Sequence, residues 1–298
     1  MKITRSSSET ALWCERYRAA GLSVGFVPTM GALHEGHLSL MRRARSECDR
    51  VVASIFVNPT QFGPKEDFSR YPSMPEADRE ACRSAGVDLL YFGRTGDMYP
   101  GGFQTWVEVE RLSQPLCGRS RPGHFRGVAT VVAQLFQIVK PHRAYFGKKD
   151  FQQCRIVQRL VEDLHMELEI RPCETVREAD GLAMSSRNAY LDPEARRIAP
   201  RIYEALRAAR DLVLAGESRA TAVADALIRE LSAQGGLEIE YAEVLDAETL
   251  DGFPGGLIQP GPGGVLLAVA ARVGGTRLID NLIVAAEEVP PGHPARGG

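Results

Sequence analysis

The sequence predicts an α/β protein in which a parallel sheet, covered by helices on both faces, is followed by a smaller α+β domain. Apolar, β-branched runs alternate with charged or amphipathic stretches through the first half of the chain. That alternation is typical of strands joined by crossover helices. After about residue 175 the helices come first and the strands afterwards, which indicates a second domain. The length of 298 residues also favours two domains.

The expected strands of the first half are short runs of apolar and β-branched residues. The first three are 22–29 (LSVGFVPT), 50–57 (RVVASIFV) and 88–92 (DLLYF), and two more follow at 143–146 (RAYF) and 168–170 (LEI). In proteins built on a parallel sheet, ligands bind at the carboxyl ends of the strands. The loops after these strands are therefore where we expect the chemistry.

Four helices are expected among these strands. In the stretch HFRGVATVVAQLFQIV, apolar residues recur with the 3.6-residue period of one helix face. The four expected helices are 37–48, 74–86, 124–139 and 150–164.

The second half opens on a helix signal, because Asp192-Pro193 combines an N-cap residue with a proline suited to the first helical position. A long helix is expected over 194–216, with a second helical stretch to about 233. Strands are expected at 237–245, 265–273 and 276–284. The expected parts are a Rossmann-like domain over 1–175, an α+β domain over 176–285 and a disordered tail over 286–298.

The composition argues against a nucleic-acid-binding, a membrane-spanning or a secreted protein. With 36 Lys and Arg against 38 Asp and Glu, the net charge is −2, which disfavours nucleic acid as a partner. The longest apolar runs fall short of the roughly 20 residues of a membrane span, and the N-terminus resembles no signal peptide. We therefore expect a cytoplasmic protein without membrane contact, and its six scattered cysteines are expected to be free thiols.

The first expected strand leads into PTMGALHEGHLSL. Gly31, after Met30, allows a tight turn or a close approach of the backbone to a ligand. His34 and His37 lie three residues apart at an expected helix start, where they share a face beside a terminus that attracts phosphate. The alternative is that both are ordinary polar loop residues. Zinc is disfavoured, because no third ligand is evident.

Two further loops of the first half are polar. Asn58 and Gln61, in NPTQF, follow the second expected strand; their amides suit neutral or carboxylate groups, although Asn-Pro is also a turn signal. The loop before the helix 124–139 is basic, which indicates either an anion site or a solvated surface. Its basic members are Arg119, Arg121, His124 and Arg126.

Two more clusters contain groups that bind phosphate. GKKDFQQ follows the fourth expected strand, and its lysines can bind phosphate while its aspartate can assist Mg²⁺. Its polar members include Lys148, Lys149, Asp150 and Gln153. READGLAMSSRN, near the expected domain boundary, has two hydroxyls and a guanidinium suited to mobile phosphate clamping, although serines also cap helices. These residues are Ser185, Ser186 and Arg187.

The segments PTMGALHEGH, NPTQF, RPGHFRGV, GKKDFQQ and READGLAMSSRN, in this order and spacing, resemble the pantoate–β-alanine ligase family over about residues 23–191. The resemblance places the chain among nucleotidyltransferases with a His-x-Gly-His motif, here residues 34–37, which are related to class I aminoacyl-tRNA synthetases. It implies ATP-dependent condensation of pantoate with β-alanine through a pantoyl adenylate, with Mg²⁺, in a cytoplasmic homodimer whose C-terminal domain acts as a lid.

The resemblance also implies roles for single residues. His37 is the family's assigned proton donor, and His34 and Lys149 are expected to act with it on the phosphates. Gln61 and Gln153 would hold pantoate, Gln61 would also bind β-alanine, and Asp150 would lie near Mg²⁺ without direct contact. The residues expected to bind ATP are Met30, Gly31, His34, His37, Gly147, Lys148, Lys149, Asp150, Val176, Met184, Ser185, Ser186 and Arg187.

Two positions depart from the family pattern: Lys148 stands where Glu is usual, and Ser73 where Arg is common. Lys148 adds positive charge beside the expected phosphates, which leaves the strength of ATP binding open. Another nucleotidyltransferase with the same histidine motif is the alternative activity, and it would not need the amides of Asn58, Gln61 and Gln153. A non-catalytic nucleotide-sensing module is disfavoured, since both histidines are present.

Overall fold

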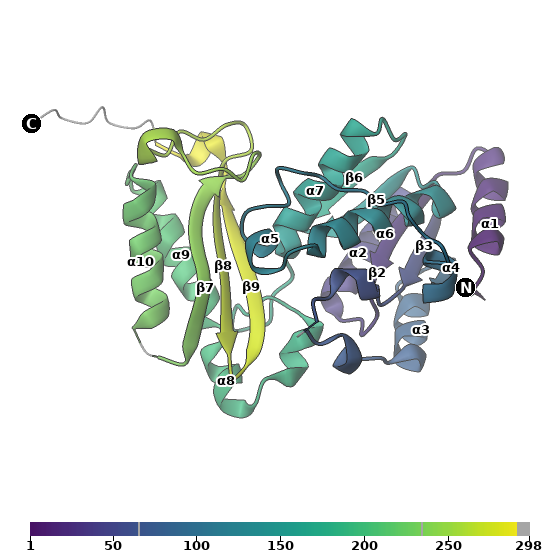
Figure 1. Ribbon diagram of the computed structural model, residues 1–298, viewed down its shortest axis with the longest axis horizontal. Helices are drawn as coiled ribbons and strands as arrows, with labels where there is room; N and C mark the ends of the chain where they lie inside the picture. Colours follow the sequence, from purple (N-terminus) through teal and green to yellow (C-terminus); the bar gives the residue numbers. More distant parts are fainter. Residues whose placement is uncertain (65, 234, 291–298) are drawn as a thin grey trace, which may run out of the picture. The chain divides into compact units, whose positions relative to one another are not determined.

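The computed structural model describes residues 1–64, 66–233 and 235–290, and the chain forms two compact units (Figure 1). The first contains residues 1–114 and 121–176. The second contains residues 115–120 and those from 177 onward. The short helix α5 (Cys117–Ser120) thus belongs by its contacts to the second unit, although the first unit precedes and follows it in sequence.

The first unit is built on a six-stranded sheet in which every neighbouring pair is parallel, in the order β1-β4-β3-β2-β5-β6. The α/β fold with a parallel sheet is therefore confirmed. The edge strand β1 was not predicted, because three residues carry no recognisable pattern. The strands are β1 (Lys2–Thr4), β2 (Val24–Thr29), β3 (Arg50–Ile55), β4 (Leu89–Phe92), β5 (Arg143–Gly147) and β6 (Glu169–Cys173).

Helices cover both faces of this sheet, as consecutive residues of β2 show. Phe26 makes an edge-on ring contact with Phe136 of α6, whereas Val27 packs in a core cluster with Met41 of α2. The longer helices are α1 (Ser7–Ala19), α2 (Glu35–Glu47), α3 (Pro75–Ser84), α6 (His124–Val139) and α7 (Phe151–Asp163), and α4 (Thr95–Met98) is a single turn. All four expected helices of this half form.

The second unit is an antiparallel sheet of β7 (Leu237–Asp246), β8 (Val265–Val273) and β9 (Thr276–Val284) with helices α8 (Pro193–Ile198), α9 (Arg201–Leu214) and α10 (Ala220–Ser232). Apolar residues of α9, α10 and the three strands share one core. The prediction of one helix over 194–216 was wrong. The helix breaks between α8 and α9 at Pro200, which has no N–H to donate and whose ring disfavours continuation.

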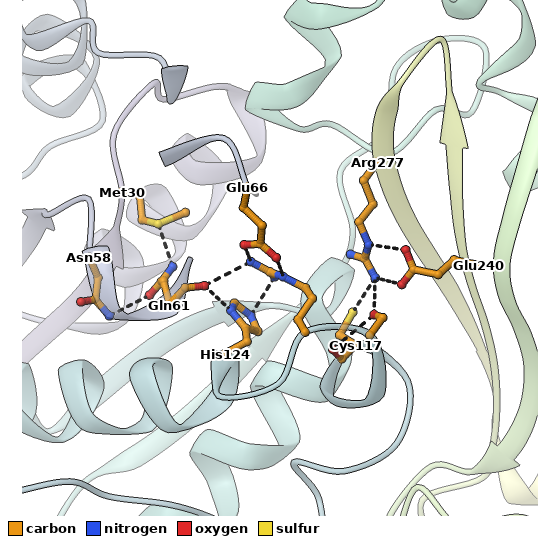
Figure 2. Close-up of polar contacts among 10 residues, drawn as sticks. Met30, Asn58, Gln61, Glu66, Cys117, His124, Glu240 and Arg277 are labelled. Carbon is orange, nitrogen blue, oxygen red and sulfur yellow. Dashed lines mark hydrogen bonds and ion pairs between the residues drawn. The ribbon is translucent and has the colours of Figure 1, made fainter. Parts of the chain in front are cut away.

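Within the second unit, α5 is held against the sheet by polar contacts (Figure 2). The Cys117 thiol lies 3.2 Å from the Tyr241 hydroxyl, and Arg277 pairs with Glu240 at 2.7 Å while donating to Ser120. These contacts fix a segment that is directly followed in sequence by Arg121 of the first unit.

Two further observations concern the C-terminal residues and the search for membrane-spanning helices. Ala286–Glu288 form a short 3₁₀ turn, whereas residues 291–298 of the expected tail lie outside the described residues. Among the residues that the structure covers, no helix combines the length and apolar character that crossing a bilayer requires.

Candidate active site

The strand order creates a switch point between β2 and β5. These strands are neighbours, with Phe26 in register with Ala144, yet the chain runs from β2 to β3 on one side and from β5 to β6 on the other. Loops leaving the carboxyl ends of two such strands diverge and open a crevice, which is where α/β sheets bind ligands. The β2 loop carries the histidine motif, and the β5 loop carries Gly147–Asp150.

The loop after β2 is shaped by backbone conformation and by one carboxylate. Gly31 has φ of 86° and Ala32 has φ of 49°, both in the left-handed region. The buried carboxylate of Asp78, on α3, accepts the N–H of Ala32 at 3.0 Å and of Leu33 at 2.8 Å. Asp78 therefore fixes the turn that delivers the chain to His34. Sequence reasoning missed this residue.

His34 and His37 form the start of α2 together. His34 is the N-cap, and its Nδ1 accepts the N–H of Gly36 at 3.1 Å, while Nδ1 of His37 faces the N–H of His34 at 3.4 Å. The ring centroids lie 4.1 Å apart. Because each Nδ1 accepts, the proton of each neutral ring lies on Nε2. Burial, and secondarily the neighbouring His34, lowers the pKa of His37 to about 3, so His37 is neutral near pH 7.

The loop after β3 forms the 3₁₀ turn η1 (Pro59–Gln61), with Asn58 as its N-cap. Asn58 is 1% exposed, and its Nδ2 donates to Oε1 of Gln61 and to the carbonyl of Gly127, both at 3.1 Å. Its Oδ1 accepts from Tyr99 and Thr60, each at 2.9 Å. Asn58 is therefore engaged by the protein itself, and Gln61 is the amide that it orients.

The loop after β5 forms the 3₁₀ turn η3 (Lys148–Asp150), which leads directly into α7. Lys148 pairs with Glu174 at 2.5 Å, and Nζ of Lys149 lies 3.5 Å from Oδ1 of Asp150. Gln153 is half-buried in the first turn of α7. The unusual Lys148 therefore has an acidic partner within the first unit.

The remaining expected ATP residues fall in two places. Val176 is half-buried beyond β6, at the end of the first unit. Met184 and the serine pair belong to the second unit, where the Ser185 hydroxyl accepts the N–H of Arg187 at 3.3 Å and caps the turn η4 (Ser186–Tyr190). The capping alternative for Ser185 is thus observed.

The four basic side chains of 119–126 all have partners within their own units. Arg119 pairs with Glu243, Arg121 pairs with Glu66, and the guanidinium of Arg126 lies 4.6 Å from the ring centroid of Trp106. His124 contacts the carbonyl of Gln61 at 2.7 Å (Figure 2). The hypothesis of an anion site at this cluster therefore receives no support from the side-chain contacts.

Within the described ranges, no group of three or more His, Cys, Asp or Glu side chains could hold a metal ion alone. Asp150, whose side chain is 47% exposed, is a carboxylate in the loop after β5. Mg²⁺ needs only one or two protein carboxylates when waters and substrate phosphates supply its other ligands. The donor set therefore fits a nucleotide-bound magnesium ion.

The family model of Pantoate-beta-alanine ligase matches residues 2–283. The chain belongs to the pantoate–β-alanine ligase family. It is 52% identical to pantothenate synthetase of Thermotoga neapolitana over 284 residues, covering 95% of this chain and 100% of the relative. For pantothenate synthetase of Moorella thermoacetica the identity is 53%, with coverage of 95% and 99%.

Solved structures of the family agree with this assignment. Pantothenate synthetase of Thermus thermophilus is 46% identical and superposes with a TM-score of 0.86, covering 97% of this chain and 100% of that one. Pantoate-beta-alanine ligase of Francisella tularensis, described as complexed with Beta-gamma ATP and Beta-alanine, is 33% identical with a TM-score of 0.76, covering 95% and 97%. The chain is thus an enzyme, a ligase of this family.

Proposed function

We propose that this chain condenses pantoate with β-alanine in two steps. A carboxylate oxygen of pantoate first attacks the α-phosphorus of ATP, the bond to the bridging oxygen breaks, and pyrophosphate leaves. The amine of β-alanine then attacks the acyl carbon of pantoyl adenylate and loses a proton, and AMP leaves with the former carboxylate oxygen. Adenylation is needed because an unactivated carboxylate has no good leaving group.

The observation that carries this proposal is the switch point. The two histidines follow β2, Lys149 and Asp150 follow β5, and these strands are neighbours. Phosphoryl chemistry of this kind depends on positioning and charge stabilisation rather than on covalent help from the protein. Two Nε2–H groups at a helix start, together with a lysine, are suited to that task.

His37 is proposed to act on the phosphates as a hydrogen-bond donor through Nε2. In the free protein its low pKa keeps it neutral. The negative charge of a bound triphosphate raises the pKa of a neighbouring imidazole, which would move His37 toward the proton donor expected of it. His34 and Lys149 are proposed to share the developing charge.

The proposed ATP site otherwise follows the family assignment. It comprises Met30, Gly31, Gly147, Lys148, Asp150, Val176, Met184, Ser185, Ser186 and Arg187. Gln61 and Gln153 are proposed to hold pantoate, with Gln61 also facing β-alanine. Phosphate oxygens and waters would hold Mg²⁺, Asp150 would lie near the ion and meet it through its waters, and the ion would neutralise phosphate charge when bound.

Compartment and assembly belong to the same proposal. All six cysteines are free thiols and five are buried, which favours a reducing compartment such as the cytoplasm.

A homodimer is proposed on the family resemblance. Light scattering of the purified protein tests it, and the mass of a single chain would refute it.

The direct test is a product assay with ATP, Mg²⁺, pantoate and β-alanine. We expect pantothenate and AMP in equal amounts, with no product when any substrate is omitted or when EDTA removes the metal. The alternative, a nucleotide-adenylating enzyme, is separated by isotope exchange between ATP and pyrophosphate. Exchange that depends on pantoate supports the proposal, whereas exchange that depends on a nucleoside monophosphate supports the alternative.

A further inference from the structure

The main chain of Gln61 is held by two side chains, those of Arg121 in the loop before α6 and of His124, the first residue of α6. Its carbonyl oxygen accepts from Nδ1 of His124 at 2.7 Å and from Nη2 of Arg121 at 3.2 Å (Figure 2). Double acceptance fixes the carbonyl of a residue that ends a three-residue turn. A turn this short has little hydrogen bonding of its own, so outside contacts decide its geometry.

These contacts also determine the tautomer of His124. Nη1 of Arg121 lies 3.0 Å from its Nε2, and a guanidinium can only donate. Nε2 must therefore accept, and the single proton of the ring lies on Nδ1, where the carbonyl of Gln61 receives it. Burial, and secondarily the charge of Arg121, lowers the pKa of His124 to about 4, which agrees with a neutral ring.

Arg121 is itself immobilised by Glu66. Its Nε and Nη2 each lie 2.6 Å from one carboxylate oxygen of Glu66, and the two side chains are 14% and 25% exposed. Bidentate pairs of this kind add geometric specificity to the strength of a charge-assisted hydrogen bond. Burial alone would raise the pKa of Glu66, but the hydrogen bond and charge of Arg121 outweigh it and lower the pKa.

The side chain of Gln61 is oriented by a different residue, Asn58. Nδ2 of Asn58 donates to the carbonyl of Gly127, so its amide orientation is settled, and the atom of Gln61 that it also meets must be Oε1. Among the described residues, the hydrogen-bond partner of Gln61 Nε2 is the weak acceptor Sδ of Met30, at 2.8 Å. Gln61 thus offers N–H donors, which suit a carboxylate or hydroxyl oxygen.

We propose that Arg121 and His124 are positioning residues, which hold the main chain of Gln61 so that its Nε2–H groups meet an oxygen of pantoate or β-alanine. They act through Gln61 and do not touch the substrate. This inference rests on the proposed function of Gln61. It replaces the anion-site hypothesis for these two residues with an indirect role.

The first test compares His124→Ala with His124→Asn, whose amide can donate from the position of Nδ1. We expect His124→Ala to raise the KM values for pantoate and β-alanine by about tenfold, the size of one well-placed hydrogen bond, with the KM for ATP changed less than about twofold. His124→Asn should restore most of the loss. His142→Ala is the matched control, because His142 also contacts a backbone group, the N–H of Val24 at 2.9 Å, at the opposite ends of the strands.

A purely structural role for His124 predicts a lower Tm with unchanged KM values in both His124→Ala and His142→Ala, and that result would overturn the inference. Failure of the proposed function is distinguishable, since the wild-type protein would then make no pantothenate.

Glu66→Gln separates positioning from direct anion binding by Arg121. If Arg121 positions Gln61, weakening its bidentate pair raises the KM for pantoate. If Arg121 bound a substrate anion directly, releasing it from Glu66 would lower that KM, and this outcome would refute the indirect role.

Discussion

The carboxylate of Asp78 accepts the backbone N–H of Leu33 at 2.8 Å, across 45 positions of sequence. Its other oxygen accepts the N–H of Ala32, so one side chain of α3 defines the turn between β2 and the histidine pair. The same carboxylate lies 3.1 Å from where a Cβ on Gly31 would stand. Asp78 therefore links the packing of α3 to the geometry of the proposed phosphate site.

Asp78→Asn should weaken ATP binding. An amide keeps one acceptor but turns an NH₂ group toward the second backbone N–H, and an unsatisfied buried donor costs about 1–3 kcal/mol. We expect a several-fold higher KM for ATP and a lower Tm. Glu80→Gln makes the same chemical change on the exposed face of α3, where Glu80 pairs with Arg83, and should alter neither quantity. Equal effects of both variants would exclude a specific role for Asp78.

His37→Ala and Lys149→Ala should each lower the rate of adenylation by at least about 10²-fold, the usual effect of losing one preorganised donor. Pantoate-dependent release of pyrophosphate measures this step without β-alanine. His165→Asn is the control, because it removes an exposed imidazole at a φ of 48°, which Asn tolerates. Near wild-type pyrophosphate release from either alanine variant would contradict the assigned roles.

Stability should depend on pH through His37. Its pKa falls from 6.5 in the unfolded chain to about 3 in the folded protein, so the unfolded state binds the proton first as pH drops. The contribution of neutral His37 to the free energy of unfolding is complete above pH 6.5. It is lost progressively toward pH 3, by at most about 1.4 kcal/mol per pH unit. Urea unfolding at pH 7, 6 and 5 should show a shallower pH dependence for His37→Gln than for the wild-type protein. Parallel curves would show that His37 titrates normally.

Gly127→Ala should disturb the turn that carries Gln61. A Cβ at this helical glycine would lie 2.4 Å from the carbonyl oxygen of Thr60, a backbone atom that cannot move alone. Overpacking of this kind costs about 1–3 kcal/mol. We expect a lower Tm together with a raised KM for pantoate. Gly96→Ala, also within a helix but with open space around its Cβ, should leave both unchanged; the same loss in both variants would rule out the steric explanation.

The parallel sheet of the first unit could be predicted because its strands β2, β3 and β4 are mostly apolar runs, the pattern of strands buried on both faces. Helix α1 escaped prediction, since its buried residues are only Thr10 and Cys14 and form no apolar stripe. The single helix expected over 194–216 is the opposite kind of error, because a helix was predicted where the chain breaks. The helical composition of that stretch was given more weight than Pro200, which has no backbone N–H to donate.

The candidate site was partly readable from the sequence. The motifs located the loops after β2, β3 and β5, because ligand-binding residues of parallel sheets lie at the carboxyl ends of the strands. Asp78 and Tyr99 could not be found this way, since their partners in the site lie 45 and 41 positions away and only the fold brings them near. Arg121 was singled out for its charge, but pattern alone could not reveal that Glu66 neutralises it.

Transfer of oxygen from pantoate to AMP tests the central claim most directly. With pantoate labelled by ¹⁸O in its carboxylate, formation of the adenylate and attack by β-alanine must leave one labelled oxygen in AMP and one in pantothenate. Mass spectrometry of AMP from a single incubation with ATP, Mg²⁺ and β-alanine should show one ¹⁸O per molecule. AMP without label, formed alongside pantothenate, would show that the carboxylate never attacked the α-phosphorus.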